Sequence, residues 1–187
     1  VGFSLGGTIA LALADRRPDL VGALGLACCG VASRPEGVAA TEAMLERAAR
    51  LGAVAFAEEQ AEAIWSGSWR RANRAAVAAF VARRSAMDQA VLTKVFRAGY
   101  GIDLTAALGR VAVPALVIAA ADDRFVSVER MAAIAAALPD GRMETIAASG
   151  HMVMHEAPAP FDAALAGFLA EAWPPPSRAA APARGTA

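Results

Sequence analysis

Apolar positions along the chain form short continuous runs separated by stretches with helical spacing. Residues 20–28 are continuously apolar and contain glycine, which suits a strand buried on both faces of a parallel sheet, although periodicity alone leaves a helix open. Residues 113–119 predict a second strand, with Pro114 near its start, where a missing hydrogen-bond donor is tolerated. The alternating residues 142–147 predict a third strand.

The stretches between these runs are typical of helices. Residues 8–15 are good helix formers that directly follow a glycine-rich turn. Residues 35–108, rich in Ala, Arg and Glu, predict several amphipathic helices with breaks at Gly52, Gly67 and Gly99. Further helices are expected at 127–138, where Ser127 supplies an N-cap, and at 157–173.

Strand and helix therefore alternate, which predicts an α/β domain with a parallel sheet. The Pro- and Ala-rich residues 174–187 show no apolar period, and we expect them to be disordered.

Composition narrows the classes of partner. The chain has 18 basic and 18 acidic residues and no block of like charge, so it offers no footprint for nucleic acid. Its longest apolar run, residues 20–32, is interrupted by glycines and is shorter than the roughly 18 to 20 residues that span a bilayer. No stretch resembles a signal peptide. We therefore expect a cytoplasmic protein with a small-molecule substrate, and neither nucleic acid nor membrane as a partner.

The only cysteines are the adjacent Cys28 and Cys29, which cannot form a disulfide framework. We interpret them as reduced, buried small hydrophobic residues, with a reactive thiol as the alternative.

A candidate nucleophile lies at the start of the chain. Gly2-Phe3-Ser4-Leu5-Gly6 matches the G-x-S-x-G pattern, in which a serine occupies a strained turn between a strand and a helix. We expect a side chain at either glycine to clash where strand and helix come close. The backbone N–H of Leu5, at the positive end of the following helix, is placed to donate to an oxyanion. An ordinary glycine-rich turn is the other interpretation of so short a motif.

Two later segments supply partners for a serine. Asp122 and Asp123 directly follow the strand predicted at 113–119, where parallel sheets assemble their sites. One of the two carboxylates could orient a histidine, and the other would then belong to a solvated turn. His151, after the last predicted strand, could activate the hydroxyl of Ser4 as a neutral imidazole.

The chain has only one other histidine, His155. Its spacing from His151 suits two metal ligands on a helix, but no third ligand accompanies them, so we expect no metal. His155 is expected at the surface or near the start of the final helix.

Together, these three segments resemble the α/β-hydrolase superfamily in their order Ser, Asp, His and in their spacing. The similarity is strongest to small esterases and lactonases of the 3-oxoadipate enol-lactonase type, carboxylic-ester hydrolases and cofactor-free haloperoxidases. In these relatives the catalytic aspartate commonly stands in Gly-x-x-Asp-x-x-Val-Pro, which places Asp123 in that role. Ala120 and Ser127 depart from that pattern, and neither departure removes a catalytic group.

The resemblance implies a three-layer α/β-hydrolase fold with a parallel sheet and a helical cap, and without the N-terminal half of the sheet. Residues 1–34 and 109–173 would form the hydrolase core, 35–108 the cap and 174–187 the tail. The absent half would hold the second oxyanion donor, and the isolated fragment would then be inactive.

The resemblance also implies a function, a serine hydrolase without cofactor that acts on a small ester, thioester or lactone. Substrate-binding candidates are Phe3, Trp65, Trp69, Phe125 and Met152, although large side chains in a cap, with Phe80, Phe96 and Tyr100 among them, are more often core. A non-catalytic ligand binder, a C–C bond hydrolase and a haloperoxidase with the same triad stay open, and so does the oligomeric state.

Overall fold

The computed structural model describes residues 1–173, and the tail predicted to be disordered lies outside them. Four parallel strands form one sheet in the order β1-β2-β3-β4. The strands are β1 (Gly2–Phe3), β2 (Leu24–Ala27), β3 (Ala115–Ala120) and β4 (Gly141–Ile146). The helices are α1 (Leu5–Arg16), a short 3-10 helix (Pro18–Leu20), α2 (Pro35–Leu51), α3 (Ala53–Ile64), α4 (Gly67–Ala72), α5 (Arg74–Ser85), α6 (Gln89–Arg97), α7 (Thr105–Leu108), α8 (Val128–Ala137), α9 (Val153–Glu156) and α10 (Pro158–Ala172).

The predicted α/β architecture with a parallel sheet is confirmed, and the helix left open for residues 20–28 is excluded. All residues of β2 and β3 are buried, as expected for inner strands with helices on both faces. β2 is shorter than the apolar run because Pro18–Leu20 form a 3-10 helix and the strand begins only at Leu24. β4 pairs on one side only and is largely exposed, which is typical of an edge strand.

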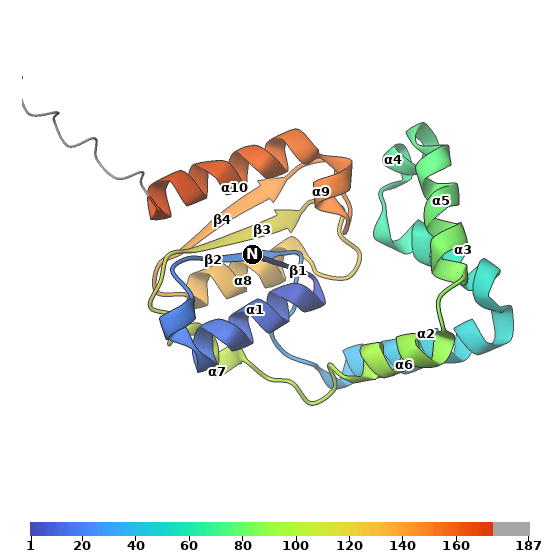
Figure 1. Cartoon of the computed structure of the whole chain (residues 1–187), viewed down its shortest axis with the longest axis horizontal. Helices are drawn as coiled ribbons and strands as arrows, with labels where there is room; N and C mark the ends of the chain where they lie inside the picture. Colours follow the sequence, from blue (N-terminus) through green and yellow to red (C-terminus); the bar gives the residue numbers. More distant parts are fainter. Residues whose placement is uncertain (174–187) are drawn as a thin grey trace, which may run out of the picture.

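Helices cover both faces of the sheet and make three layers (Figure 1). On one face α1, α7 and α8 pack against alternate residues of the strands, among them Leu26 and Val117, and α8 contributes Met131. On the other face α9 and α10 pack against the intervening residues, among them Leu116 and Ile118, and α10 contributes Phe168. The period of two along β3 thus divides its side chains between the two halves of the core.

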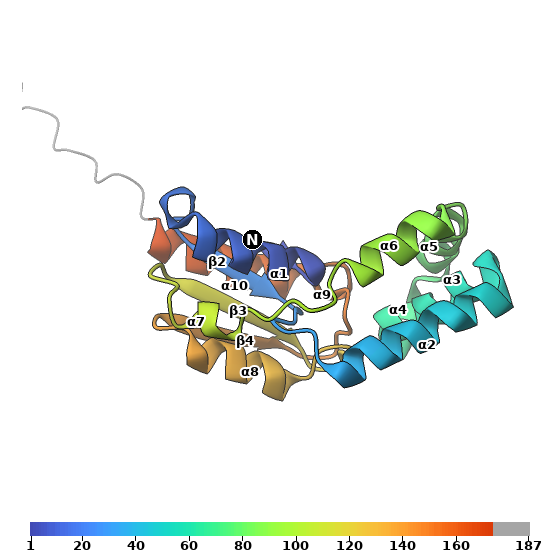
Figure 2. The same ribbon diagram turned by 90° about the horizontal axis from the view of Figure 1, so that it is seen from below.

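Helices α2 to α6, residues 35–97, form a unit that we call the helical block. It lies beyond the carboxyl ends of the strands, apart from the layered core (Figures 1 and 2). Gly52 separates α2 from α3 with a φ of 81°, as predicted. The break predicted at Gly67 lies directly before it, at Trp65 and Ser66, because Gly67 already begins α4 and Ser66 caps that helix by accepting a hydrogen bond from the Trp69 N–H.

Within residues 1–173 we find no helix with the length and apolar character needed to cross a bilayer.

Candidate active site

Ser4 occupies a tight turn between β1 and α1. Its backbone has φ 50° and ψ −124°, a strained conformation for a residue with a side chain. The Ser4 N–H donates to the carbonyl of Ala27 at 2.9 Å, and the Ser4 carbonyl accepts from the Gly7 N–H at 2.9 Å. Strand pairing and the first turn of α1 therefore hold the strained residue from both sides.

The glycine requirement of this turn differs from the prediction at one position. A Cβ at Gly2 would lie 2.2 Å from the Gly6 carbonyl oxygen, so Gly2 is required for the close approach of strand and helix, as expected. Gly6 is different, since a Cβ there would meet open space. The second tight position is Gly7, where a Cβ would lie 2.6 Å from the Cys29 side chain.

The structure brings Ser4, His151 and Asp123 together from three separate loops. Nε2 of His151 lies 3.0 Å from Oγ of Ser4, and Nδ1 of His151 lies 2.8 Å from Oδ2 of Asp123. Because a carboxylate accepts, the proton of the neutral imidazole belongs on Nδ1, which leaves Nε2 free to accept from the Ser4 hydroxyl. This is the arrangement in which a histidine can remove a proton from a serine.

The two neighbouring aspartates have opposite environments. Oδ1 of Asp123 accepts from the backbone N–H groups of Phe125 at 2.8 Å and Val126 at 3.2 Å, and its side chain is fully buried. Asp122 is exposed. The carboxylate that orients His151 is thus itself fixed by the backbone of the loop after β3.

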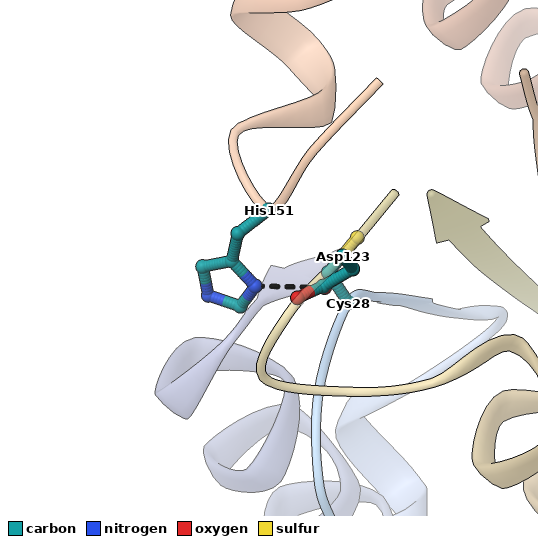
Figure 3. Close-up of side chains that lie close together, drawn as sticks. All are labelled: Cys28, Asp123 and His151. Atoms are coloured by element: carbon teal, nitrogen blue, oxygen red, sulfur yellow. Dashed lines mark hydrogen bonds and ion pairs between the residues drawn. The ribbon is translucent and has the colours of Figure 1, made fainter. Parts of the chain in front are cut away.

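Cys28 lies beside this pair (Figure 3). Its sulfur, a carboxylate oxygen of Asp123 and a ring nitrogen of His151 all lie within 4.8 Å of one another. A metal would require the thiolate, but burial and the neighbouring Asp123 raise the pKa of the Cys28 thiol. Both nitrogens of His151 already face partners. The chemistry of this donor set therefore does not suit a metal ion.

Leu5 begins α1, and its N–H belongs to the first turn, whose amides have no acceptor within the helix. The positive end of the helix dipole lies at the same point. Both properties suit an oxyanion donor next to Ser4, which remains a prediction for this amide.

Three of the predicted substrate-binding residues lie at or beside the histidine. The rings of Phe3 and Phe125 approach the His151 ring with centroid distances of 4.9 and 5.0 Å. Phe125 is half exposed, so it borders solvent as well as the imidazole. Met152 follows His151, and its N–H donates to the carbonyl of Ile64 at 3.2 Å. Their contact with a substrate remains a prediction.

Trp65 and Trp69 instead belong to an aromatic cluster inside the helical block. Their rings stack at a centroid distance of 4.8 Å, and Phe80 packs edge-on against Trp65 at 4.9 Å. Trp65 is buried. These contacts give the two tryptophans a structural role in the helical block, and pocket lining remains a prediction.

The helical block and the histidine loop meet at a contact that the sequence did not reveal. The Ser66 N–H donates to Oε2 of Glu156 at 3.0 Å, and a Cβ at Gly150 would lie 2.9 Å from the Ser66 nitrogen. The only sequence signal is the position of Glu156, five residues after His151. His155 is exposed on α9, as expected.

Comparison with known proteins agrees with this fold. Residues 1–164 match the model of the alpha/beta hydrolase family. A "Putative carbamate hydrolase RutD" of Pseudomonas savastanoi pv. phaseolicola is 28% identical over 171 residues, which cover 90% of this chain and 66% of the relative.

Solved structures give the same result. A hydrolase from Pseudomonas aeruginosa PA01 has a TM-score of 0.81 at 27% identity, covering 90% of this chain and 63% of that one. The enol-lactonase from Burkholderia xenovorans LB400 has a TM-score of 0.81 at 21% identity, covering 90% and 64%. The chain thus spans about two thirds of these relatives, and with the family model matched over residues 1–164 it belongs to the alpha/beta hydrolase family.

Proposed function

We propose that the protein is a serine hydrolase that cleaves a small carboxylic ester, thioester or lactone through an acyl-enzyme. The observation that carries the proposal is the continuous line from Asp123 through His151 to Ser4, with separations of 2.8 and 3.0 Å. A serine hydroxyl is a weak nucleophile at neutral pH, and a neighbouring imidazole oriented by a carboxylate is what activates it.

In the proposed reaction Oγ of Ser4 attacks the carbonyl carbon while Nε2 of His151 takes the hydroxyl proton. The Leu5 N–H stabilises the oxyanion that forms, and Asp123 stabilises the imidazolium. His151 then gives the proton to the leaving alcohol or thiol, or to the ring oxygen of a lactone. Water, deprotonated by His151, releases the acid from Ser4.

The names of related proteins support hydrolysis of a small acyl compound without specifying the substrate. The 28%-identical relative carries the name of a carbamate hydrolase, and one similar fold belongs to an enol-lactonase. Specificity in such folds resides in the residues around the triad. We therefore assign the reaction class from Ser4, His151 and Asp123 and leave the acyl group to experiment.

A fluorophosphonate probe together with short-chain aryl esters tests the proposal. In the longer protein that the resemblance implies, wild type should be labelled and active, whereas Ser4→Ala should lose labelling and several orders of magnitude of kcat/KM. Ser85→Ala is the matched control, because the Ser85 hydroxyl lies exposed on α5 and bonds only to its own helix. Equal labelling of wild type and Ser4→Ala would remove Ser4 from the mechanism. A folded wild-type protein that neither reacts nor hydrolyses would favour a non-catalytic binder.

A further inference from the structure

A cavity lies inside the helical block, away from the triad. It has a volume of about 260 Å³ and is enclosed by α2, α3, α5 and α6. Most of its lining is apolar. Its large apolar side chains are Leu45, Phe56, Leu92 and Phe96, and its polar side chains are Arg84, Gln89 and Thr93. At about 30 Å³ per water molecule, this volume is large enough for a small organic acid.

Arg84 in the wall of this cavity is a buried cation without a counter-ion among residues 1–173. The residue is 8% exposed, and neither Nη1 nor Nη2 has a hydrogen-bond partner. The guanidinium carbon of Arg84 lies over the ring of Phe56, 5.5 Å from the ring centroid. Burial lowers the pKa of Arg84, yet a guanidinium stays protonated in proteins. An unpaired buried charge is strongly unfavourable, so this arrangement calls for an anion.

Within residues 1–173, no acidic side chain lines the cavity. The other two polar side chains already donate to backbone carbonyls, Gln89 to Met87 and Thr93 to Gln89. Arg84 is the one cation that residues 1–173 place in the cavity wall, which matches the single charge of a carboxylate better than a phosphate dianion.

We propose that this cavity binds the carboxylate of a small organic acid, with Arg84 as its ion-pair partner. A guanidinium presents two parallel N–H donors that match the two oxygens of a carboxylate. The apolar side chains around it would contact the carbon chain of the acid and hold water away from the ion pair. The assignment rests on Arg84 and its surroundings and does not depend on catalysis at Ser4.

The position of the cavity leaves two sources for the carboxylate. Phe56 precedes Ile64 by eight residues on α3, and Ile64 contacts the histidine loop. At 1.5 Å per residue the cavity lies on the order of 12 Å along the helix from that contact. The carboxylate could therefore be the far end of a long substrate or a separate acid.

Thermal unfolding in the presence of glutarate, with the neutral glutaramide as control at equal ionic strength, tests binding. Saturating glutarate should raise the Tm of the wild-type protein by roughly 5 °C, and glutaramide should not. Arg83→Gln is the matched control, because Arg83 is an exposed neighbour on the same helix, and its Tm should rise as in wild type. Arg84→Gln should lose the shift. Arg84→Lys, which keeps the charge but not the paired donors, should retain only part of it.

Absence of a difference between glutarate and glutaramide on the wild-type protein would overturn the proposal, whether or not the variants fold. An equal shift in wild type and Arg84→Gln would also overturn it, since binding would then lie elsewhere.

A kinetic comparison distinguishes the two sources and rests on the proposed hydrolase function. Aryl esters of dodecanoate and of dodecanedioate differ by a terminal carboxylate, and their acyl chain is long enough to reach from Ser4 toward the cavity. If the bound carboxylate is the substrate's own, Arg84→Gln should raise KM at least 10-fold for the dodecanedioate ester alone. If a separate acid binds, free glutarate should change hydrolysis of the dodecanoate ester in wild type and not in Arg84→Gln. Loss of all hydrolysis with an intact Tm shift would reject the proposed function and leave the carboxylate site standing.

Discussion

At the scale of single residues, the loop after β3 gives two adjacent aspartates opposite roles. Asp123 is fully buried and accepts hydrogen bonds from two backbone amides and from His151. Asp122 is exposed. Removing the charge of Asp123 should therefore change how the His151 imidazole is held, whereas removing the charge of Asp122 should change only the solvent-facing surface.

Asp123→Asn should lower kcat of the proposed hydrolysis by roughly 10⁴-fold, because an amide can donate to Nδ1 and favour the wrong tautomer of His151. Asp122→Asn is the matched control and should remain within about twofold of wild type. Steady-state kinetics at equal folded concentration checks both. Equal losses in the two variants would contradict the assignment of Asp123.

The two buried thiols predict a loss of stability at alkaline pH. Burial raises the pKa of Cys29 to about 12 and raises the pKa of Cys28 as well, whereas an unfolded thiol ionises near about 8.5. Below that pH the thiols are neutral in both states and their contribution is fully present. Between about 8.5 and 12 the unfolded chain releases protons that the folded chain keeps, so each thiol lowers the free energy of unfolding by up to about 1.4 kcal/mol per pH unit.

Urea unfolding at pH 7.5 and 9.5 measures this effect. The decrease should be smaller in the double variant Cys28→Ala/Cys29→Ala, whatever its stability at pH 7.5. The native thiols should also resist alkylation by iodoacetamide at pH 8.5 and react once urea unfolds the chain. Rapid alkylation of the native protein would show that at least one thiol is accessible and ionised.

The G-x-S-x-G motif indicated Ser4, and the position after a predicted strand indicated His151 and the pair Asp122 and Asp123. The choice of Asp123 within that pair came from the resemblance to α/β-hydrolases. Cys28, Glu156 and Arg84 could not be found this way. Their importance depends on which side chains lie beside them, and those neighbours come from distant segments, Ser66 for Glu156 and Phe56 for Arg84. A buried charge without a partner is visible only once the helices are packed.

At the scale of elements, it was easier to predict which segments form strands than where each strand begins and ends. The apolar run at 20–28 contains β2, but the run begins in the 3-10 helix Pro18–Leu20 and the strand begins only at Leu24. The need for glycine is equally hard to predict from sequence. The motif marks both Gly2 and Gly6, but whether a side chain fits at each position depends on the atoms that pack against its Cα. Only the packing of Cys29 against α1 makes Gly7 the constrained position.

Gly7→Ala and Gly6→Ala form a matched pair on the first turn of α1. Gly7→Ala should destabilise the protein by about 1–3 kcal/mol, because its methyl group would overlap the Cys29 side chain. Gly6→Ala should be neutral or stabilising by up to about 1 kcal/mol, because its methyl group meets open space and alanine favours helix. Urea denaturation measures both, and the reverse order would contradict the position of α1 against Cys29.

At the scale of the whole molecule, the layered core and the helical block differ in how deeply their residues are buried. Every residue of β3 is buried, whereas α2 and α6 contain no buried residue. Hydrogen bonds between the helical block and the core include one from Ser66 to Glu156 and one from Met152 to Ile64. Elements with little buried apolar surface open at lower free energy than the core.

Native-state hydrogen exchange should therefore show two classes of amide. Amides of β3 should exchange only through global unfolding, whereas those of α2 and α6 should exchange through local opening at least about 2 kcal/mol lower, or about 30-fold faster. Gly7→Ala supplies the control, because a destabilised core should lower protection in β3 and leave α2 and α6 unchanged. If protection in all these elements were equal and fell together in Gly7→Ala, block and core would unfold as one cooperative unit. A substrate or acid that binds in the block would then be coupled to Ser4 through global stability and not through local opening of α2 and α6.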